Sequence, residues 1–158
     1  MNQIEPVKNI TDHTDNGWAP DLFSALEDEL SSALSLYWST AGDILRDSGI
    51  ELLEPPEDFF SIDKNFFSAL FLYSYKRAGI PRPRRILYGA VNQCLRGMVT
   101  GCDNILDDEY KRTLATSLPK QGVRFRSIID IMVSDCVLFE ILLKMSLFAS
   151  VGLLSVTY

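Results

Sequence analysis

Histidine and cysteine are scarce in this sequence of 158 residues, and their scarcity argues against several classes of site. The only histidine, His13, lies in a polar N-terminal segment, which leaves little material for a Ser-His-Asp or Cys-His catalytic site or for a zinc site. The three cysteines, Cys94, Cys102 and Cys136, are odd in number and have no C-x-x-C spacing. Since the N-terminus has no signal-peptide pattern, we expect reduced, mostly buried thiols in a cytoplasmic protein.

Long apolar runs and an excess of positive charge are also missing. Residues 145–158 are almost wholly uncharged, but they fall short of the roughly 18–20 apolar residues that span a bilayer, which argues against a membrane span. The net charge of −6 argues against general nucleic-acid binding. Residues 1–63 hold fourteen acidic and two basic residues, whereas residues 64–158 hold seven acidic and thirteen basic ones. A locally basic region around an acidic cluster suits a polyanionic ligand that arrives with its own metal ion.

The apolar pattern predicts an all-α protein with a mobile tail over residues 1–18 and one helical domain over residues 19–158. Segments rich in proline and glycine separate the expected helices. We expect these helices over about 20–47, from 61 or 63 to about 78, from about 83 through the acidic cluster, and over about 124–146. The uncharged residues 145–158 predict a buried helix whose packing partners lie outside this chain.

The densest functional signal is the acidic segment from Asp103 to Glu109, which the basic pair Lys111-Arg112 follows. Asp103 and Asp107 are four residues apart and lie on one face of a helix, where like charges destabilise an isolated helix by a few tenths of a kcal/mol. A cation between them would relieve this repulsion, and Mg2+ prefers oxygen ligands and often completes its shell with substrate phosphate. A solvated acidic helix end explains the spacing equally well, so both interpretations stay open.

A second charged cluster lies upstream, where five bases straddle a helix break. Guanidinium groups and free backbone amides at such a break can bind phosphate, although a solvated basic turn is the simpler explanation of this cluster alone. Acids for a metal together with bases for phosphate are what a diphosphate site requires. Gly97 and Gly101, one turn before the acids, indicate either close helix packing or clearance for a ligand. The five bases are Lys76, Arg77, Arg82, Arg84 and Arg85.

In these features the chain resembles the class I isoprenoid synthases, specifically the trans-polyprenyl diphosphate synthases. Their first aspartate-rich motif, D-D-x-x-D followed by an arginine pair, would be Asp103–Asp107 here, with Asp108 and Lys111-Arg112 after it. Their upstream G-K-R-x-R-P segment is matched loosely by Lys76-Arg77 and Arg82–Arg85, and their later G-D by Ser134-Asp135.

The resemblance implies a helical bundle of the isoprenoid-synthase type that joins an allylic diphosphate to isopentenyl diphosphate. It implies that Asp103, Asp107 and, as a third or outer ligand, Asp108 hold Mg2+, with Arg112 also acting in catalysis. It implies diphosphate binding by the bases Lys76, Arg77, Arg82, Arg84, Arg85, Lys111 and Arg112.

Departures from the family pattern keep other readings open. Asn104 replaces the second aspartate, and Asp103 with Asp107-Asp108 also forms a D-x-x-x-D-D pattern closer to the head-to-head squalene and phytoene synthases. The resemblance covers residues 20–150 and lacks the family's second aspartate-rich motif, so we expect the first half of such a fold, completed by a homodimer partner or by a C-terminal half. The alternatives are a non-catalytic interaction module and an unrelated helical protein that docks its C-terminal apolar segment.

Overall fold

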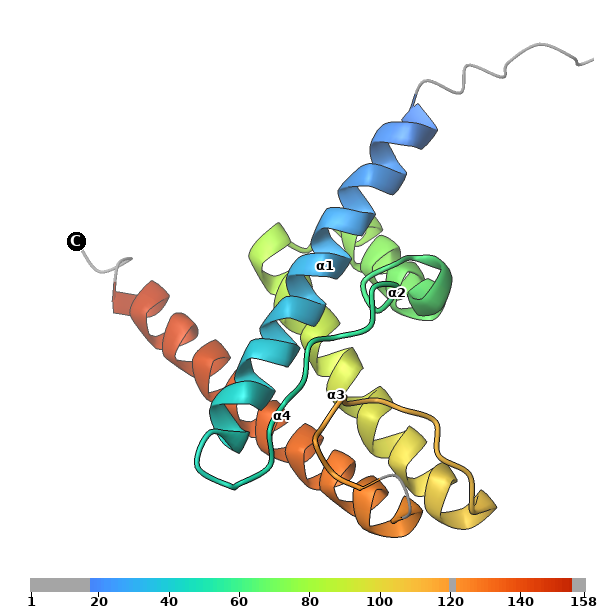
Figure 1. Ribbon diagram of the computed structural model, residues 1–158. Coiled ribbons are helices and arrows are strands. Elements are labelled where there is room, and N and C mark those ends of the chain that lie inside the picture. The colour runs from blue at the N-terminus through green and yellow to red at the C-terminus, as the bar shows by residue number, and fades with distance from the viewer. Residues whose placement is uncertain (1–17, 120–121, 155–158) are drawn as a thin grey trace, which may run out of the picture.

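The computed structural model describes residues 18–119 and 122–154, and side chains from 22 to 146 within them, and it consists of helices (Figure 1). Within these residues there is no β-strand, and one isolated antiparallel bridge joins Leu52 to Thr116. The prediction of an all-α fold is therefore confirmed. The predicted tail, with His13, lies outside the described residues except for Trp18. The elements are α1 (Trp18–Leu45), the 3-10 helix η1 (Asp63–Asn65), α2 (Phe66–Arg77), α3 (Arg82–Asp107) and α4 (Val123–Leu154).

Residues with restricted or permissive backbones set the ends of α2 and α3. After α2, Gly79 adopts a φ of 75°, a left-handed conformation that glycine takes without steric cost. Pro81 is extended at the N-cap of α3, and Pro83 occupies its first turn, where a backbone amide hydrogen is not needed. Asp108 ends α3 with a φ of 55°. The chain thus reverses direction directly after the acidic cluster, and the loop 109–119 returns toward the start of α4.

Helix α4 is longer than the sequence predicted, because it continues through the uncharged segment to Leu154. Its C-terminal part extends past the other helices (Figure 1). No helix in the described part of the chain combines the length and the apolar character that a membrane crossing requires.

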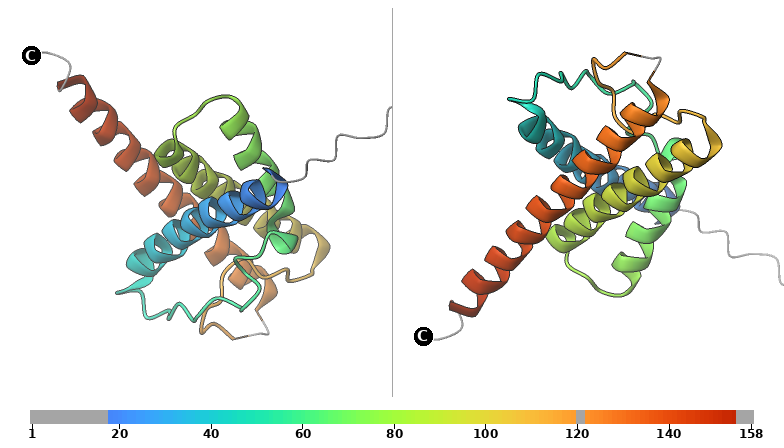
Figure 2. Two further views of the ribbon diagram at one scale, coloured as in Figure 1. Left: turned by 90° about the horizontal axis from the view of Figure 1, so that it is seen from above. Right: turned by 90° about the horizontal axis from the view of Figure 1, so that it is seen from below.

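The core lies where α1 crosses the pair α3 and α4, with α2 packed against α1 and α3 (Figure 2). Tyr37 of α1 is fully buried there, and its hydroxyl lies 3.0 Å from the hydroxyl of Ser134 on α4. Burial raises the pKa of Tyr37, so it stays neutral. The buried core residues around it are Ala41, Leu45, Ala90, Cys94, Leu114, Val133, Val137 and Ile141.

Gly97 and Gly101 bring α3 and α4 into close contact. A Cβ atom on Gly97 would lie 2.2 Å from the Ser134 hydroxyl oxygen. A Cβ atom on Gly101 would lie 2.5 Å from a side-chain carbon of Ile131 and 3.0 Å from the carbonyl oxygen of Ser127. Of the two explanations that the sequence left open for these glycines, helix packing is therefore the one that the structure supports.

The outer faces of α3 and α4 lie on the side away from α1 (Figure 2, right). Many large apolar side chains of these two helices are exposed in the described chain. On α4 they are Phe125, Ile128, Met132, Phe139, Leu142 and Leu143, and on α3 they are Leu95, Val99 and Leu106.

Candidate functional site

The two acidic residues Asp103 and Asp107 lie exposed on one face of the last turns of α3. Neither has a hydrogen-bond or ion-pair partner within the described residues. Asp108 differs, because it forms the left-handed end of the helix and its carboxylate lies 3.7 Å from the Arg124 guanidinium at the start of α4. The structure thus leaves two carboxylates available to an external cation and gives the third a protein partner.

Asn104, at the position of the second aspartate in the resembled motif, has a structural role. Its side chain is buried, and its amide forms two hydrogen bonds with the backbone of Lys111: the Lys111 N–H donates to its Oδ1 at 2.8 Å, and its Nδ2 donates to the Lys111 carbonyl at 3.0 Å. An aspartate could not make the second of these bonds, because an ionised carboxylate only accepts. Asn104 therefore anchors the returning loop and does not face the solvent side of the acidic pair.

A basic pocket of about 280 Å3 lies where η1, α3 and the loop 109–119 meet. Three cationic side chains line it: Lys64, Arg96 and Arg112. Arg96 is held in place because its Nη1 donates to Oδ1 of the buried Asn65 at 2.6 Å. Arg112 has no ion-pair partner in the described chain, and the pairing of Lys64 with Asp58 is a loose, exposed contact of 3.5 Å. Such a site attracts an anion with several oxygens, because guanidinium groups bind phosphate oxygens in pairs.

One polar atom beside this pocket lacks a partner. Gln93 lines the pocket and is buried, and its Oε1 receives no hydrogen bond from any described residue. Buried polar atoms are normally satisfied, so a water molecule or the protonated edge of a ligand is expected here.

An apolar hollow of about 580 Å3 adjoins the basic pocket. Lys64, Asn65 and Arg96 line both spaces, so the two are neighbours that share these residues as walls. The hollow lies between α2 and α3, and most of the large apolar side chains that line it are exposed; Phe67 is 74% exposed. Its apolar lining consists of Phe66, Phe67, Phe71, Leu95 and Val99.

One stripe of α3 connects the pocket, the hollow and the acids. Arg96, Val99, Asp103 and Asp107 follow one another at intervals of three or four residues and are all exposed. At 1.5 Å per residue, Arg96 lies about 10 Å along the axis from Asp103, which is close enough for one ligand with a diphosphate group and an apolar chain to reach both. Sequence reasoning missed Arg96, although its spacing of seven from Asp103 was a usable signal. It also missed Lys64, for which the sequence offers no signal.

A buried polar cluster fixes the loop that carries Lys111 and Arg112. Asp130 of α4 is fully buried and accepts hydrogen bonds from the Tyr110 hydroxyl at 3.0 Å and from the Thr113 hydroxyl at 2.9 Å. Burial raises the pKa of Asp130 to about 6, although both hydroxyls and the nearby Arg126 oppose this shift. Sequence reasoning missed Asp130 as well. An aspartate within the apolar run of α4 was the available signal.

The upstream basic segment is not part of this site. Arg82 pairs with Asp28 of α1, and Arg85 forms a buried ion pair with Glu29 that includes a hydrogen bond from its Nε at 2.8 Å. From Arg85 to Asp103 the axis of α3 rises by about 27 Å. The predicted phosphate ligands Lys76, Arg77, Arg82, Arg84 and Arg85 therefore lie at the other end of the helix, and the structure does not bring them to the acidic pair.

The Ser134-Asp135 pair has two separate environments. Ser134 is buried against Gly97 and Tyr37, whereas Asp135 is exposed on the outer face of α4. Among the described residues, no group of three or more histidine, cysteine, aspartate or glutamate side chains is arranged to hold a metal ion. Any ion at Asp103 and Asp107 would need oxygen atoms from its ligand or from water.

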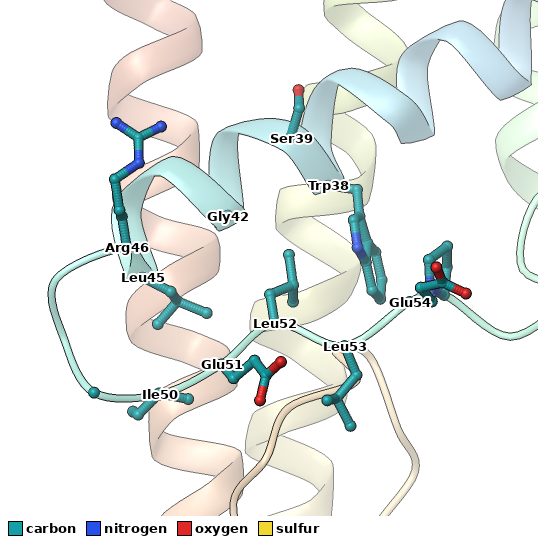
Figure 3. Close-up of a pocket in the computed structure, with 12 residues that line it drawn as sticks. Trp38, Ser39, Gly42, Leu45, Arg46, Ile50, Glu51, Leu52, Leu53 and Glu54 are labelled. Atoms are coloured by element: carbon teal, nitrogen blue, oxygen red, sulfur yellow. The ribbon is translucent and has the colours of Figure 1, made fainter.

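A larger hollow of about 720 Å3 lies elsewhere, between the end of α1 and residues 50–55 (Figure 3). Trp38 and Leu45 of α1 face Leu52 across it. None of the site residues predicted from the sequence lines this hollow, and its apolar walls carry no cluster of cations.

Comparison with family models, with curated proteins and with solved structures gives no match to this chain.

Proposed function

We propose that this protein binds prenyl diphosphates, with the diphosphate group in the basic pocket and the hydrocarbon chain in the adjoining apolar hollow. The observation that carries the proposal is that the basic pocket and the apolar hollow lie side by side and share Lys64, Asn65 and Arg96 as lining residues. A simple phosphate would not need the apolar hollow, and a neutral lipid would not need three cations. A ligand with both an anionic group and an apolar chain matches the whole surface.

The acidic pair fits a divalent cation that accompanies this ligand. Asp103 and Asp107 supply carboxylate oxygens on one helical face and have no protein partner in the described chain, and Mg2+ commonly uses one or two carboxylates plus substrate phosphate. When bound, Mg2+ would supply Lewis-acid stabilisation of a departing diphosphate. Asp108 is drawn toward Arg124 and would serve only as an outer ligand.

The proposed parent reaction is the elongation of an allylic diphosphate with isopentenyl diphosphate, as the resemblance to the isoprenoid synthases implies. In that reaction Arg96 and Arg112 donate to the diphosphate oxygens and hold them in place. Leu95, Val99 and Phe71 keep water away from the hydrocarbon chain along one wall. This wall would be the first half of an isoprenoid-synthase bundle, completed by a second copy or by a C-terminal half.

A thermal-shift titration tests the binding. With Mg2+ and geranyl diphosphate at about 100 times the dissociation constant, the free energy of unfolding should rise by about 2.7 kcal/mol. The rise should shrink in Arg96→Gln and Asp103→Asn and persist in the matched control Arg46→Gln, which removes an exposed guanidinium directly after α1. An equal rise in all four proteins, or none in the wild type, would contradict the proposal.

Prenyl transfer by the isolated 158-residue chain should be undetectable, because its sequence offers one carboxylate cluster of the two that the resembled enzymes use. Incubation of the purified chain with geranyl diphosphate, isopentenyl diphosphate and Mg2+ checks this. Measurable product would show that one cluster suffices.

The second candidate is a non-catalytic binding module. The observation that favours it is the buried, structural role of Asn104 at the position of the second aspartate in the resembled motif. Absence of any Mg2+-dependent shift in both the wild type and the Asp103→Asn variant would favour this module.

A further inference from the structure

The loop that carries Arg112 is attached to α4 through one buried carboxylate. The Oδ2 atom of Asp130 accepts two hydrogen bonds, from the Tyr110 hydroxyl at 3.0 Å and from the Thr113 hydroxyl at 2.9 Å. These residues flank Lys111 and Arg112 on both sides. Thr113 itself lines the basic pocket next to Arg112. The position of the Arg112 guanidinium therefore depends on contacts that converge on Asp130, in addition to the two hydrogen bonds between Asn104 and Lys111.

In the described chain, hydrogen-bond donors reach only one of the two carboxylate oxygens of Asp130. Arg126, one turn earlier on α4, stacks on the Tyr110 ring at 4.2 Å, and its Nε has no hydrogen-bond partner among the described residues. The second oxygen of Asp130, Oδ1, also lacks a donor in the described chain. Tyr37 of α1 is the other titratable group that faces Asp130. A buried carboxylate with one unsatisfied oxygen is costly, and such groups call for an explanation beyond packing.

We propose that Asp130 is a positioning residue that, by holding Tyr110 and Thr113, keeps Arg112 in the basic pocket. The predicted effect on diphosphate affinity rests on the proposed function. The predicted effect on the loop does not. Asp130 touches neither the diphosphate nor the acidic pair.

Two influences on the pKa of Asp130 oppose each other. Burial is the larger one and raises this pKa to about 6, whereas the hydrogen bonds from Tyr110 and Thr113 lower it. By linkage, both hydroxyls bind the ionised carboxylate more tightly than the neutral acid. At pH 7.5 Asp130 is ionised, and Tyr110, whose pKa is raised to about 12, keeps its hydroxyl proton, so both hydrogen bonds are present.

Limited trypsin digestion at pH 7.5 measures how firmly the loop is held without any ligand. Trypsin cuts after Lys111 and Arg112 in the loop and after Arg77 at the end of α2, and the ratio of the two rates cancels differences in trypsin activity between samples. In Asp130→Asn the ratio should be about tenfold higher than in the wild type, because hydrogen bonds to an ionised acceptor are lost.

Three further variants keep the test independent of any folding defect in Asp130→Asn. Thr113→Val removes one hydroxyl and should raise the ratio, whereas Thr113→Ser retains the hydroxyl and should keep the wild-type ratio. Glu140→Gln removes an exposed carboxylate from the same helix and should leave the ratio unchanged. A wild-type ratio in Asp130→Asn or in Thr113→Val would overturn the proposal.

Calorimetry with inorganic diphosphate at pH 7.5 then separates the two proposals. Weaker binding by Asp130→Asn and Thr113→Val than by the wild type and Glu140→Gln is expected, in the same order as the cleavage ratios. Equal affinity in all of them would overturn the positioning role. If no protein binds diphosphate while the cleavage ratios behave as expected, the proposed function fails and the control of the loop by Asp130 stands.

Discussion

The two ends of α3 carry charges of the sign that a helix disfavours, but only one end is compensated by the protein. The helix dipole favours acids at the N-terminus and bases at the C-terminus. Helix α3 has bases and no acid in its first turn, and no base in its last turn, where Asp107 lies. At the N-terminal end, Asp28 and Glu29 of α1 pair with the bases. At the C-terminal end, Asp103 and Asp107 have no such partner in the described chain.

This comparison separates a charge cluster that is paired within the protein from one that has no partner in the described chain. Both clusters stand out equally in the sequence, and the sequence alone suggested that they form a single site. The structure uses the basic cluster to attach α3 to α1 and leaves the acidic pair with an uncompensated electrostatic cost. A bound cation would remove that cost, so the acidic end is the one at which a ligand is expected.

The largest effect should come from breaking the compensated end. Glu29→Ala would leave Arg85 buried without its partner, since the two side chains are only 4% and 12% exposed. Removal of one member of a buried ion pair costs about 3–5 kcal/mol, which urea denaturation would measure. The control Asp28→Ala breaks an exposed pair at the same end and should cost at most about 1 kcal/mol. Similar losses in both variants would show that the buried pair has no special role.

Part of this arrangement could be predicted from the sequence. The period of the apolar residues and the prolines and glycines between them predicted the ends of α1, α2 and α3 to within a few residues. The partners of Arg82 and Arg85 could not be predicted, because they lie more than fifty positions away on α1 and meet α3 only through packing. The basic pocket was missed for the same reason: η1, α3 and the loop each contribute one cation, and no local pattern joins Lys64, Arg96 and Arg112.

A second buried acid lies beside the uncompensated end, and its titration should have the next largest effect. Asp130 has a pKa raised from 3.8 to about 6, so the folded state binds its proton more tightly than the unfolded state does. Its contribution to stability is therefore complete below pH 3.8 and is lost as the pH rises through 6. Relative to Asp130→Asn, the free energy of unfolding of the wild type should fall by on the order of 3 kcal/mol between pH 3.8 and pH 7. Denaturant titrations at several pH values would measure this difference, and parallel pH profiles would contradict it.

A smaller loss of stability is expected at the close contact of α3 with α4, next to the acidic end of α3. Gly101→Ala places a Cβ atom 2.5 Å from Ile131 and 3.0 Å from a backbone carbonyl oxygen. Overpacking costs about 1–3 kcal/mol, of which the higher helix propensity of alanine offsets about 1 kcal/mol. Gly42→Ala in α1 is the matched control, because its Cβ atom would meet only Leu52 at 3.5 Å. Thermal unfolding should show a lower midpoint for Gly101→Ala and an equal or higher one for Gly42→Ala. If Gly42→Ala were destabilised as well, overpacking would no longer explain the loss of stability in Gly101→Ala.

The smallest change in stability, and the most informative one, should come from the uncompensated end itself. Asp107→Asn removes both the repulsion from Asp103 and an acid from the last turn of α3, so without ligand the protein should gain about 0.5–1 kcal/mol. The same variant should lose the stabilisation by Mg2+ and geranyl diphosphate, so that one substitution stabilises the free protein and weakens the bound one. Thermal unfolding with and without both additives measures the two effects together. A gain without ligand and an undiminished response to ligand would mean that the acidic pair is only a solvated helix end, and a loss of stability without ligand would mean that Asp107 has a protein partner after all.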